Sequence, residues 1–350
     1  MTPDTPAPNQ AGQINVAIRD VACHLPSKAV SNDALAMENA HWDMNQVEQR
    51  AGVRQRHIAG DNETALDLGH QATLKLLAAN PDLKSQIDVV LFCTQCPDYI
   101  MPPNACILHK LLDLPETVLA FDINLGCSGY IYALTIARGL IAAGTAANVL
   151  IVNADTYSKY IHKKDRSARV LFGDGAATSW IARNDGADSG IIDLLCGTSG
   201  RNFDAFLIPA GGCRHARTAQ TAAEMTDISG NVRTQENIHM DGMGILSFVN
   251  SRVPRQVSAL LARNDLSVSD VDLFIFHQAS KMALDSLDRL LKIPPDKTFR
   301  NLLMIGNTVS ASIPIAIREA ADQGRLKKGD TVVLCGFGVG MSLGSVLLKW

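Results

Sequence analysis

Residues 88–96 read DVVLFCTQC, and residues 272–280 read DLFIFHQAS. After an initial aspartate, each stretch has an unbroken apolar run, which is typical of a strand buried on both faces of an α/β sheet. Each run ends in polar or reactive side chains. Each half of the chain also closes with a glycine-rich turn into an apolar strand, FGDGAATSWIA at 172–182 and FGVGMSLGSVLL at 337–348. The repeat predicts two similar halves that meet near residues 183–190.

Outward from these strands, β-type runs alternate with apolar residues at helical spacing. The predicted strands are 14–21, 88–93, 117–123, 148–153, 176–182, 190–196, 272–276 and 331–335, and the predicted helices are 65–77, 102–112, 128–143, 249–262, 280–291 and 310–323. This succession predicts an α/β fold with largely parallel, buried sheets.

Three segments follow from this plan. Residues 1–13 are polar and proline-rich, without the features of a signal peptide, and are predicted to be a flexible tail. Residues 14–185 are predicted to form the N-terminal half and residues 186–350 the C-terminal half. The least regular stretch, 201–236, has neither helical nor strand periodicity and predicts a long surface excursion, a kind of loop that is often functional.

The composition limits the class of protein. The chain has 350 residues, of which 47% are hydrophobic and 19% charged, with a formal net charge of −3. These values predict a globular protein with a sizeable core, and without a basic excess we set nucleic-acid binding aside. Residues 331–348 are long enough to span a membrane, but four glycines divide them into two short β-rich runs. A buried hairpin is therefore predicted there, with no membrane span.

Eight cysteines in a chain of this length are too few for a disulfide-stapled scaffold. Cys93 and Cys96 form a CxxC pair, but no second pair or histidine cluster completes a zinc site. The sequence therefore predicts no metal, no redox cofactor and a reducing, cytoplasmic location.

The first candidate for chemistry is Cys127 in NLGCSG, residues 124–129. A strand ends, glycines flank the cysteine, and a helix begins at once. A helix N-terminus offers unpaired N–H groups and a partial positive charge, which favour a nucleophilic thiolate. The alternative is a small buried core cysteine.

His277 and Asn307 also stand at the ends of predicted elements, in FHQAS at 276–280 and GNTVS at 306–310. Taken alone, His277 is better explained as a core histidine, and Asn307 with Thr308 as a helix cap. Together with Cys127 they form a more informative set. A neutral histidine and an asparagine amide can both donate to one oxygen, which suits stabilising an enolate beside a thiolate.

The sequence resembles the β-ketoacyl-[acyl carrier protein] synthase III family of the thiolase superfamily. The resemblance extends from about residue 14 over nearly the whole chain. It rests on Cys127, then His277 in HQAS, then Asn307 in GNTVSASIP, and on AGVRQRHIA at 51–59, DRSARVLFGDGAA at 165–177 and FGVGMSLGS at 337–345.

The resemblance implies two βαβαβαββ halves in a five-layer αβαβα sandwich, and a homodimer. It implies that Cys127 takes an acyl group from acyl-CoA or an acyl carrier protein (acyl-ACP). His277 and Asn307 would then hold the thioester carbonyl of malonyl-ACP while it loses CO₂, and the carbanion would attack acyl-Cys127. The backbone N–H groups of Cys127 and Val339 would form the oxyanion hole.

Several positions depart from the family's pattern. Arg50 and Arg166 keep the basic positions for the nucleotide end of CoA, but Ser280 replaces an asparagine that binds the pantetheine arm. The family's adenine-stacking tryptophan aligns with Gln46, with Trp42 four residues earlier, and Ser167 replaces a glycine. These departures predict altered CoA recognition or a carrier-protein donor.

The acyl pocket and the surface also differ from the family's pattern. Met101 stands where a phenylalanine usually crosses the dimer interface to floor the acyl pocket, which implies either a differently shaped pocket or neutral drift. Residues 211–236 form an insertion that either covers the pocket, contacts a carrier or is decoration. Four cations offer either a landing site for an acidic carrier or a solvated face: Arg214, His215, Arg217 and Lys281.

The favoured function is decarboxylative condensation that initiates fatty-acid or specialised acyl-chain synthesis. The first alternative keeps acyl-Cys127 but passes the acyl group to an alcohol or amine without decarboxylation. A papain-type Cys-His-Asn hydrolase is a further alternative, which is disfavoured because such hydrolases lack the thiolase-like halves and the 165–177 motif. A catalytically silent subunit is disfavoured because all three active residues are retained.

Overall fold

Two mixed β-sheets organise the molecule, for which the computed structural model describes residues 14–186 and 189–350. The predicted tail at 1–13 lies outside the described residues. The first sheet has the order β1-β7-β6-β4-β5, and its strands are β1 (Val16–His24), β4 (Val89–Cys93), β5 (Leu119–Ile123), β6 (Asn148–Asp155) and β7 (Gly175–Arg183). The second has the order β13-β14-β15-β8, and its strands are β8 (Gly190–Thr198), β13 (Leu273–Phe276), β14 (Thr331–Gly338) and β15 (Ser342–Lys349).

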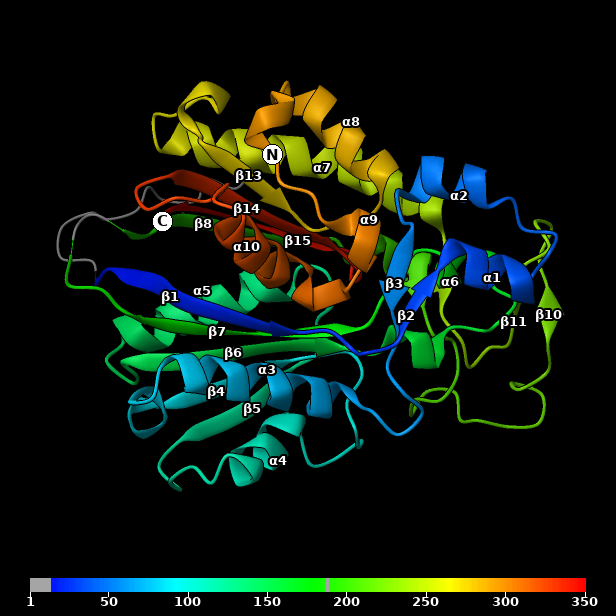
Figure 1. Ribbon diagram of the computed structural model, residues 1–350, viewed down its shortest axis with the longest axis horizontal. Helices are drawn as coiled ribbons and strands as arrows, with labels where there is room; N and C mark the ends of the chain where they lie inside the picture. The colour runs from blue at the N-terminus through cyan, green and yellow to red at the C-terminus, as the bar shows by residue number, and fades with distance from the viewer. Residues whose placement is uncertain (1–13, 187–188) are drawn as a thin grey trace.

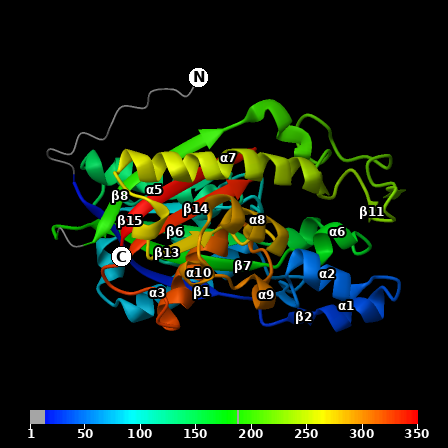
Figure 2. The ribbon, with the colours of Figure 1, turned by 90° about the horizontal axis from the view of Figure 1, so that it is seen from above.

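Helices separate and cover the sheets, giving the five layers expected of this fold (Figure 1). The first sheet is covered on its outer face by α3 (Ala65–Ala79) and α4 (Asn104–Leu111). The second is covered by α7 (Gly242–Arg263) and α8 (Lys281–Leu291), as Figure 2 shows from above. Between the sheets lie α5 (Gly129–Ala142) and α10 (Ser312–Asp322).

Alternation along the buried strands divides the core. In β4, which is wholly buried, Val90 and Phe92 belong to the cluster that includes α3 and α4. Val89 and Leu91 point the other way, into the cluster around α5 and α10. Since side chains alternate along a strand, a strand covered on both faces must be apolar at every position. This explains why the sequence there reads as a continuous apolar run.

The expectation of largely parallel sheets is wrong. Only β4–β5, β4–β6 and β13–β14 pair in parallel, whereas β1–β7, β6–β7, β14–β15 and β8–β15 are antiparallel. Parallel neighbours need a crossover connection. Each half ends instead with two strands that follow each other without a helix crossing the sheet, so they return antiparallel. The predicted 331–348 hairpin is confirmed as β14–β15.

The halves are similar but not identical. In the second sheet, a single parallel β-bridge between Phe274 and Thr298 stands where the first sheet has its fifth strand. The strands of the first sheet all precede residue 185 in the sequence, and those of the second sheet all follow residue 186. The division of the chain into two halves at this point stays a prediction. No helix among the described residues has both the length and the apolar composition needed to cross a bilayer.

Short elements gather at one end of the sheets, at the right in Figure 1. They are β2 (Ala29–Ser31), α1 (Asn32–Glu38), α2 (Met44–Ala51), β3 (Gln55–His57), α6 (Arg166–Arg169), β9 (Phe206–Leu207), β10 (Met225–Thr226), β11 (Val232–Arg233), β12 (His239–Met240) and α9 (Leu302–Ile305). Helix α7 begins seven residues before its predicted start, because the Asp241 carboxylate accepts from the N–H groups of Met243 and Gly244 and caps it.

Candidate active site

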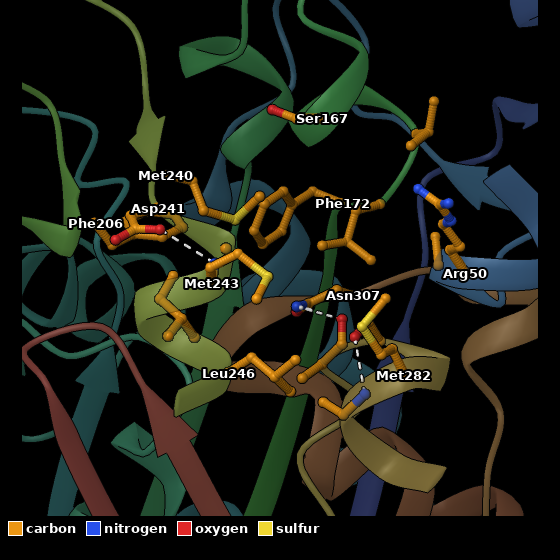
Figure 3. Close-up of a pocket in the computed structure, with 18 of the residues that line it drawn as sticks. Arg50, Ser167, Phe172, Phe206, Met240, Asp241, Met243, Leu246, Met282 and Asn307 are labelled. Carbon is orange, nitrogen blue, oxygen red and sulfur yellow. Dashed lines mark hydrogen bonds between the residues drawn. The ribbon is translucent and has the colours of Figure 1, made fainter. Parts of the chain in front are cut away.

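The predicted reactive residues come together in one cavity. Cys127 follows β5, His277 follows β13 and Asn307 follows α9, and all three line a cavity of about 610 Å³. The residues that line the cavity come from the ends of the two sheets and from the short elements beside them (Figure 3). Side chains separated by as many as 180 positions in the sequence therefore share one site.

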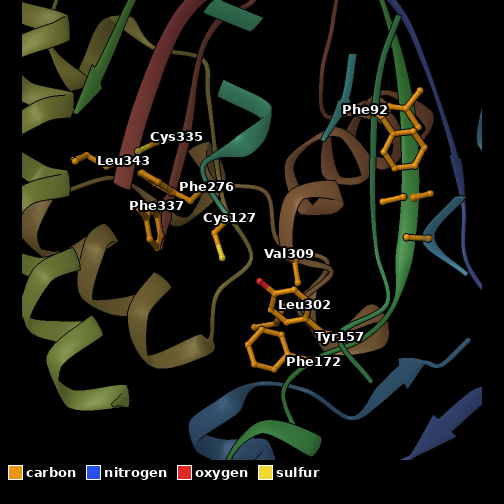
Figure 4. Packing of buried hydrophobic residues seen from close by; sticks show 14 of the residues in the cluster. Phe92, Cys127, Tyr157, Phe172, Phe276, Leu302, Val309, Cys335, Phe337 and Leu343 are labelled. Atoms are coloured by element: carbon orange, nitrogen blue, oxygen red, sulfur yellow. The ribbon is translucent and has the colours of Figure 1, made fainter. Parts of the chain in front are cut away.

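Cys127 is 6% exposed and lies between Phe337 and Val309 (Figure 4). The end of β14 approaches it closely because that strand has glycine at the contact. Gly338 has φ +155°, and a Cβ there would lie 2.7 Å from both Cβ and Sγ of Cys127. A Cβ on Gly336 would lie 2.8 Å from the Cys127 carbonyl oxygen. Glycine at both positions lets the backbone of one half surround the nucleophile of the other.

Two backbone N–H groups, of Val339 and of Cys127 itself, reach the Cys127 sulfur and lower its pKa. Burial has the larger, opposite effect and raises the pKa of the thiol to about 12. Burial therefore opposes the thiolate that the helix N-terminus is expected to favour, and the nearby carboxylate of Asp155 raises the pKa of Cys127 further.

His277 is held as a neutral donor. Its backbone N–H donates to the carbonyl of Cys335 at 2.8 Å, and its Nδ1 lies 2.6 Å from the Ser312 hydroxyl. Burial lowers the pKa of His277 to about 3. When Ser312 donates to Nδ1, the single ring proton is on Nε2, which is then a donor for a ligand.

Asn307 is fixed through both ends of its amide. Its Oδ1 accepts from the Val309 N–H at 2.9 Å, and its Nδ2 donates to the Ala279 carbonyl at 3.3 Å (Figure 3), which leaves the second Nδ2 hydrogen for a ligand. Val309 has φ +53°, a strained value for a β-branched residue. The next residue, Ser310, is held by Asp155, so the strained turn is fastened to the opposite half.

The outer part of the cavity contains the other predicted binding residues. Arg50 from α2, Arg166 from α6, and Ser280 and Val339 all line it. The Ser280 hydroxyl also accepts from the Ala283 N–H and caps α8. Met101 is 78% exposed and is not part of the lining within this chain.

Gln46 lines the cavity, whereas Trp42 does not. Trp42 is buried against Leu35 and Val170 and precedes the start of α2, so it is a core residue.

Sequence reasoning missed the apolar wall. It is formed by Phe172, Phe206, Met240, Met243, Leu246 and Met282 (Figure 3). Phe206 lies in the irregular stretch 201–236 and Met240 shortly after it, while Met243 and Leu246 lie in the glycine-containing start of α7. No periodicity marked these positions. Within residues 14–186 and 189–350, no cluster of three or more His, Cys, Asp or Glu side chains forms a candidate metal site.

Comparisons with known proteins address the same regions. The family model for 3-oxoacyl-[acyl-carrier-protein (ACP)] synthase III matches residues 121–200, and the model for the C-terminal part of that family matches residues 261–350. The first range contains Cys127, and the second contains His277 and Asn307.

Curated relatives match over almost their whole length. The β-ketoacyl-[acyl-carrier-protein] synthase III of Solibacter usitatus is 32% identical, covering 95% of this chain and 98% of the relative. That of Sulfurovum sp. is 33% identical, covering 98% of each.

Solved structures agree. A 2.1 Å crystal structure of a 3-oxoacyl-(acyl-carrier-protein) synthase III superposes with a TM-score of 0.94 at 40% identity, covering 96% of this chain and all of that one. The enzyme from Pseudomonas aeruginosa PAO1 gives 0.83 at 32% identity, covering 96% and 98%.

Proposed function

The chain belongs to the β-ketoacyl-[acyl-carrier-protein] synthase III family, and on this premise we propose that Cys127, His277 and Asn307 carry out its condensing reaction. The activity is that of an acyl-transferring condensing enzyme of the fatty-acid biosynthesis type. The observation that carries the assignment of residues is their meeting in one cavity, with a buried thiol, a neutral histidine and a fixed amide.

In the first step, Cys127 Sγ attacks the carbonyl of acyl-CoA or acyl-ACP. The sulfur forms a thioester with the acyl group, and the thiol proton leaves with the departing CoA or carrier thiol. The N–H groups of Cys127 and Val339, which already reach the sulfur, are placed to stabilise the oxyanion beside it.

In the second step, the carbonyl oxygen of malonyl-ACP accepts hydrogen bonds from His277 Nε2 and Asn307 Nδ2. These donors stabilise the enolate that forms as CO₂ departs. The enolate carbon attacks the acyl-Cys127 carbonyl, and the C–S bond to Cys127 breaks to release a β-ketoacyl thioester. The Cys127 thiolate that leaves takes a proton from water. No metal or redox cofactor is needed in this scheme.

Arg50 and Arg166 suit the phosphate groups of a thioester carrier. Both line the cavity, and within the part of the chain that the structure describes neither guanidinium makes a hydrogen bond or ion pair with the protein. Ser280, the N-cap residue of α8, offers a short hydroxyl side chain as a hydrogen-bonding partner for the pantetheine arm. The four exposed cations of the predicted landing site, Arg214, His215, Arg217 and Lys281, stay a prediction.

A homodimer completes the proposal. β5 is an edge strand of the first sheet and exposes Leu119 and Phe121, while Tyr99, Ile100 and Met101 form an exposed apolar segment after β4. Unpaired strand edges and contiguous apolar surface both favour association. In the dimer Met101 would reach the acyl pocket of the second copy. A cytoplasmic location accords with eight free cysteines.

The relatives favour condensation over acyl transfer to an alcohol or amine, and the family excludes a papain-type hydrolase. Intact-protein mass after incubation with acyl-CoA and acyl-ACP thioesters tests the proposal. We expect a mass gain that is absent in Cys127→Ala and is discharged by malonyl-ACP with release of CO₂. A gain that only an alcohol or amine removes would instead establish the acyl-transfer alternative, and no gain would indicate a silent subunit.

A further inference from the structure

Residues 225–233 form a hairpin within the predicted insertion, at the mouth of the cavity. β10 and β11 pair antiparallel, and the turn between them is closed by Asp227, whose carboxylate accepts from the N–H groups of Ser229 and Asn231. Ser229 and Asn231 line the cavity together with Arg50 and Arg166. The insertion is therefore part of the site's wall.

Arg233 of the hairpin is bonded to the start of α6. Its guanidinium donates to both carboxylate oxygens of Asp165, at 2.6 and 3.2 Å, and to the Ser167 hydroxyl at 2.9 Å. It also donates to Asp227 at 3.0 Å, which ties the turn of the hairpin to the same point. The Asp165 side chain is 1% exposed and that of Arg233 is 13% exposed, so this contact is buried.

Helix α6 needs such support. It has only four residues, too few to be stable through its own hydrogen bonds, and its N-terminal cap is Asp165. Asp165 accepts from the N–H and hydroxyl of Ser167 while it accepts from Arg233. The N–H of Val232 adds a bond to the Lys164 carbonyl at 3.3 Å. The insertion thus holds the segment that carries Arg166.

We propose that Arg233 is a positioning residue that fixes Arg166 to receive the phosphate of the phosphopantetheine arm, with the hairpin 225–233 as the outer wall for that arm. This inference rests on the proposed function, since it takes a phosphopantetheine thioester as the substrate. CoA and a holo-carrier protein both contain this arm, so the two sources share the site. The Arg233 guanidinium already donates its hydrogen bonds to Asp165, Asp227 and Ser167. It therefore acts on the phosphate through Arg166 and not by direct contact.

Equilibrium binding tests this inference without requiring the reaction. CoA and holo-acyl carrier protein are titrated calorimetrically into the full chain carrying Cys127→Ala, with and without Arg233→Ala. We expect Arg233→Ala to raise both dissociation constants about tenfold, and Arg233→Lys, which keeps the charge but not the two-pronged geometry, to have an intermediate effect. Arg183→Ala is the control, because Arg183 pairs with exposed Asp185 outside the cavity.

A double-mutant cycle separates positioning from general damage. If Arg233 acts through Arg166, Arg233→Ala has little further effect once Arg166→Ala is present. Additive losses, unchanged dissociation constants, or a loss confined to one of the two titrants would each overturn the inference. Loading of Cys127 in the otherwise unchanged chain, measured by mass, reports on the proposed function separately.

Discussion

The Asp155 carboxylate accepts hydrogen bonds from both the hydroxyl and the N–H of Ser310, at 2.5 and 3.2 Å. Asp155 ends β6 in the first half, and Ser310 follows the strained Val309 in the second. The other carboxylate oxygen accepts from the Gln95 N–H at 2.8 Å. One buried side chain thus joins the turn that carries Asn307 to the half that carries Cys127.

Asp155→Asn is expected to destabilise the fold in a pH-dependent way. The amide presents a donor where the carboxylate accepts, so one buried N–H loses its partner, at a cost of about 1–3 kcal/mol. Burial raises the pKa of Asp155 to about 7, above its value near 3.9 in an unfolded chain. Between these two pKa values, Asp155 is ionised in the unfolded chain but still protonated in the folded one. The free energy of unfolding of the wild type therefore falls as the pH rises through this range.

The variant lacks that titration. The difference in unfolding free energy between wild type and Asp155→Asn should therefore narrow from pH 5 to pH 8. Denaturant unfolding at both pH values measures it, and a difference that does not change with pH would contradict the expectation.

Gly338→Ala should disable the nucleophile. The new Cβ would lie 2.7 Å from Cys127 Sγ, at a φ of +155° that side chains rarely adopt. A displacement of the sulfur by about 1 Å can cost on the order of 100-fold in rate, which single-turnover acylation measured by mass would show. Gly139→Ala is the matched control, because a Cβ in that helical position meets nothing within 4 Å. Equal acylation rates in the two variants would refute the steric argument.

Cys127 should react slowly at neutral pH and faster as the pH rises. With the pKa raised to about 12 by burial, the thiolate fraction grows about tenfold per pH unit through the accessible range. Alkylation by iodoacetamide, followed by intact mass with Cys127→Ala as the blank, measures this slope. A rate that levels off near pH 7 would show a preformed thiolate instead.

His277→Ala and Asn307→Ala should separate the two half-reactions. Each removes one enolate donor, which typically costs on the order of 100- to 1,000-fold in the step that develops the charge. Cys127 acylation should continue, while release of labelled CO₂ from malonyl-ACP falls. Because burial lowers the pKa of His277 to about 3, CO₂ release in the wild type should show no His277 titration from pH 5 to 9. Equal losses in both half-reactions would argue against the assigned roles.

Strong periodicity explains what the sequence predicts well. The six long helices and the buried strands carry enough apolar residues to be recognised. Cys127, His277 and Asn307 were singled out by their places beside predicted elements, and their roles came from the family resemblance. Helix α2 has no fully buried residue, and its short stripe of Met44, Val47 and Ala51 was too small to be recognised. Strand direction was mispredicted because it depends on connections rather than on composition.

Long-range polar contacts leave no local signal. Arg233 and Asp165 are 68 positions apart, and Asp155 and Ser310 are 155 apart. Neither pair lies in a recognisable motif as a pair. The support of the site by Asp155, Ser312 and the insertion therefore became visible only in the three-dimensional arrangement.

Ile100→Lys should weaken the proposed homodimer. Ile100 is 94% exposed beside Tyr99 and Met101, and a buried ammonium at an apolar interface is unfavourable unless it is paired. Ile228→Lys is the matched control: Ile228 is fully exposed on the hairpin 225–233, away from β5 and the segment after β4. Light scattering over a dilution series should show dissociation of Ile100→Lys at concentrations where the wild type and Ile228→Lys remain dimeric. Equal dimer stability in the wild type, Ile100→Lys and Ile228→Lys would show that the interface lies elsewhere. It would also contradict the proposal that Met101 enters the acyl pocket of the second copy.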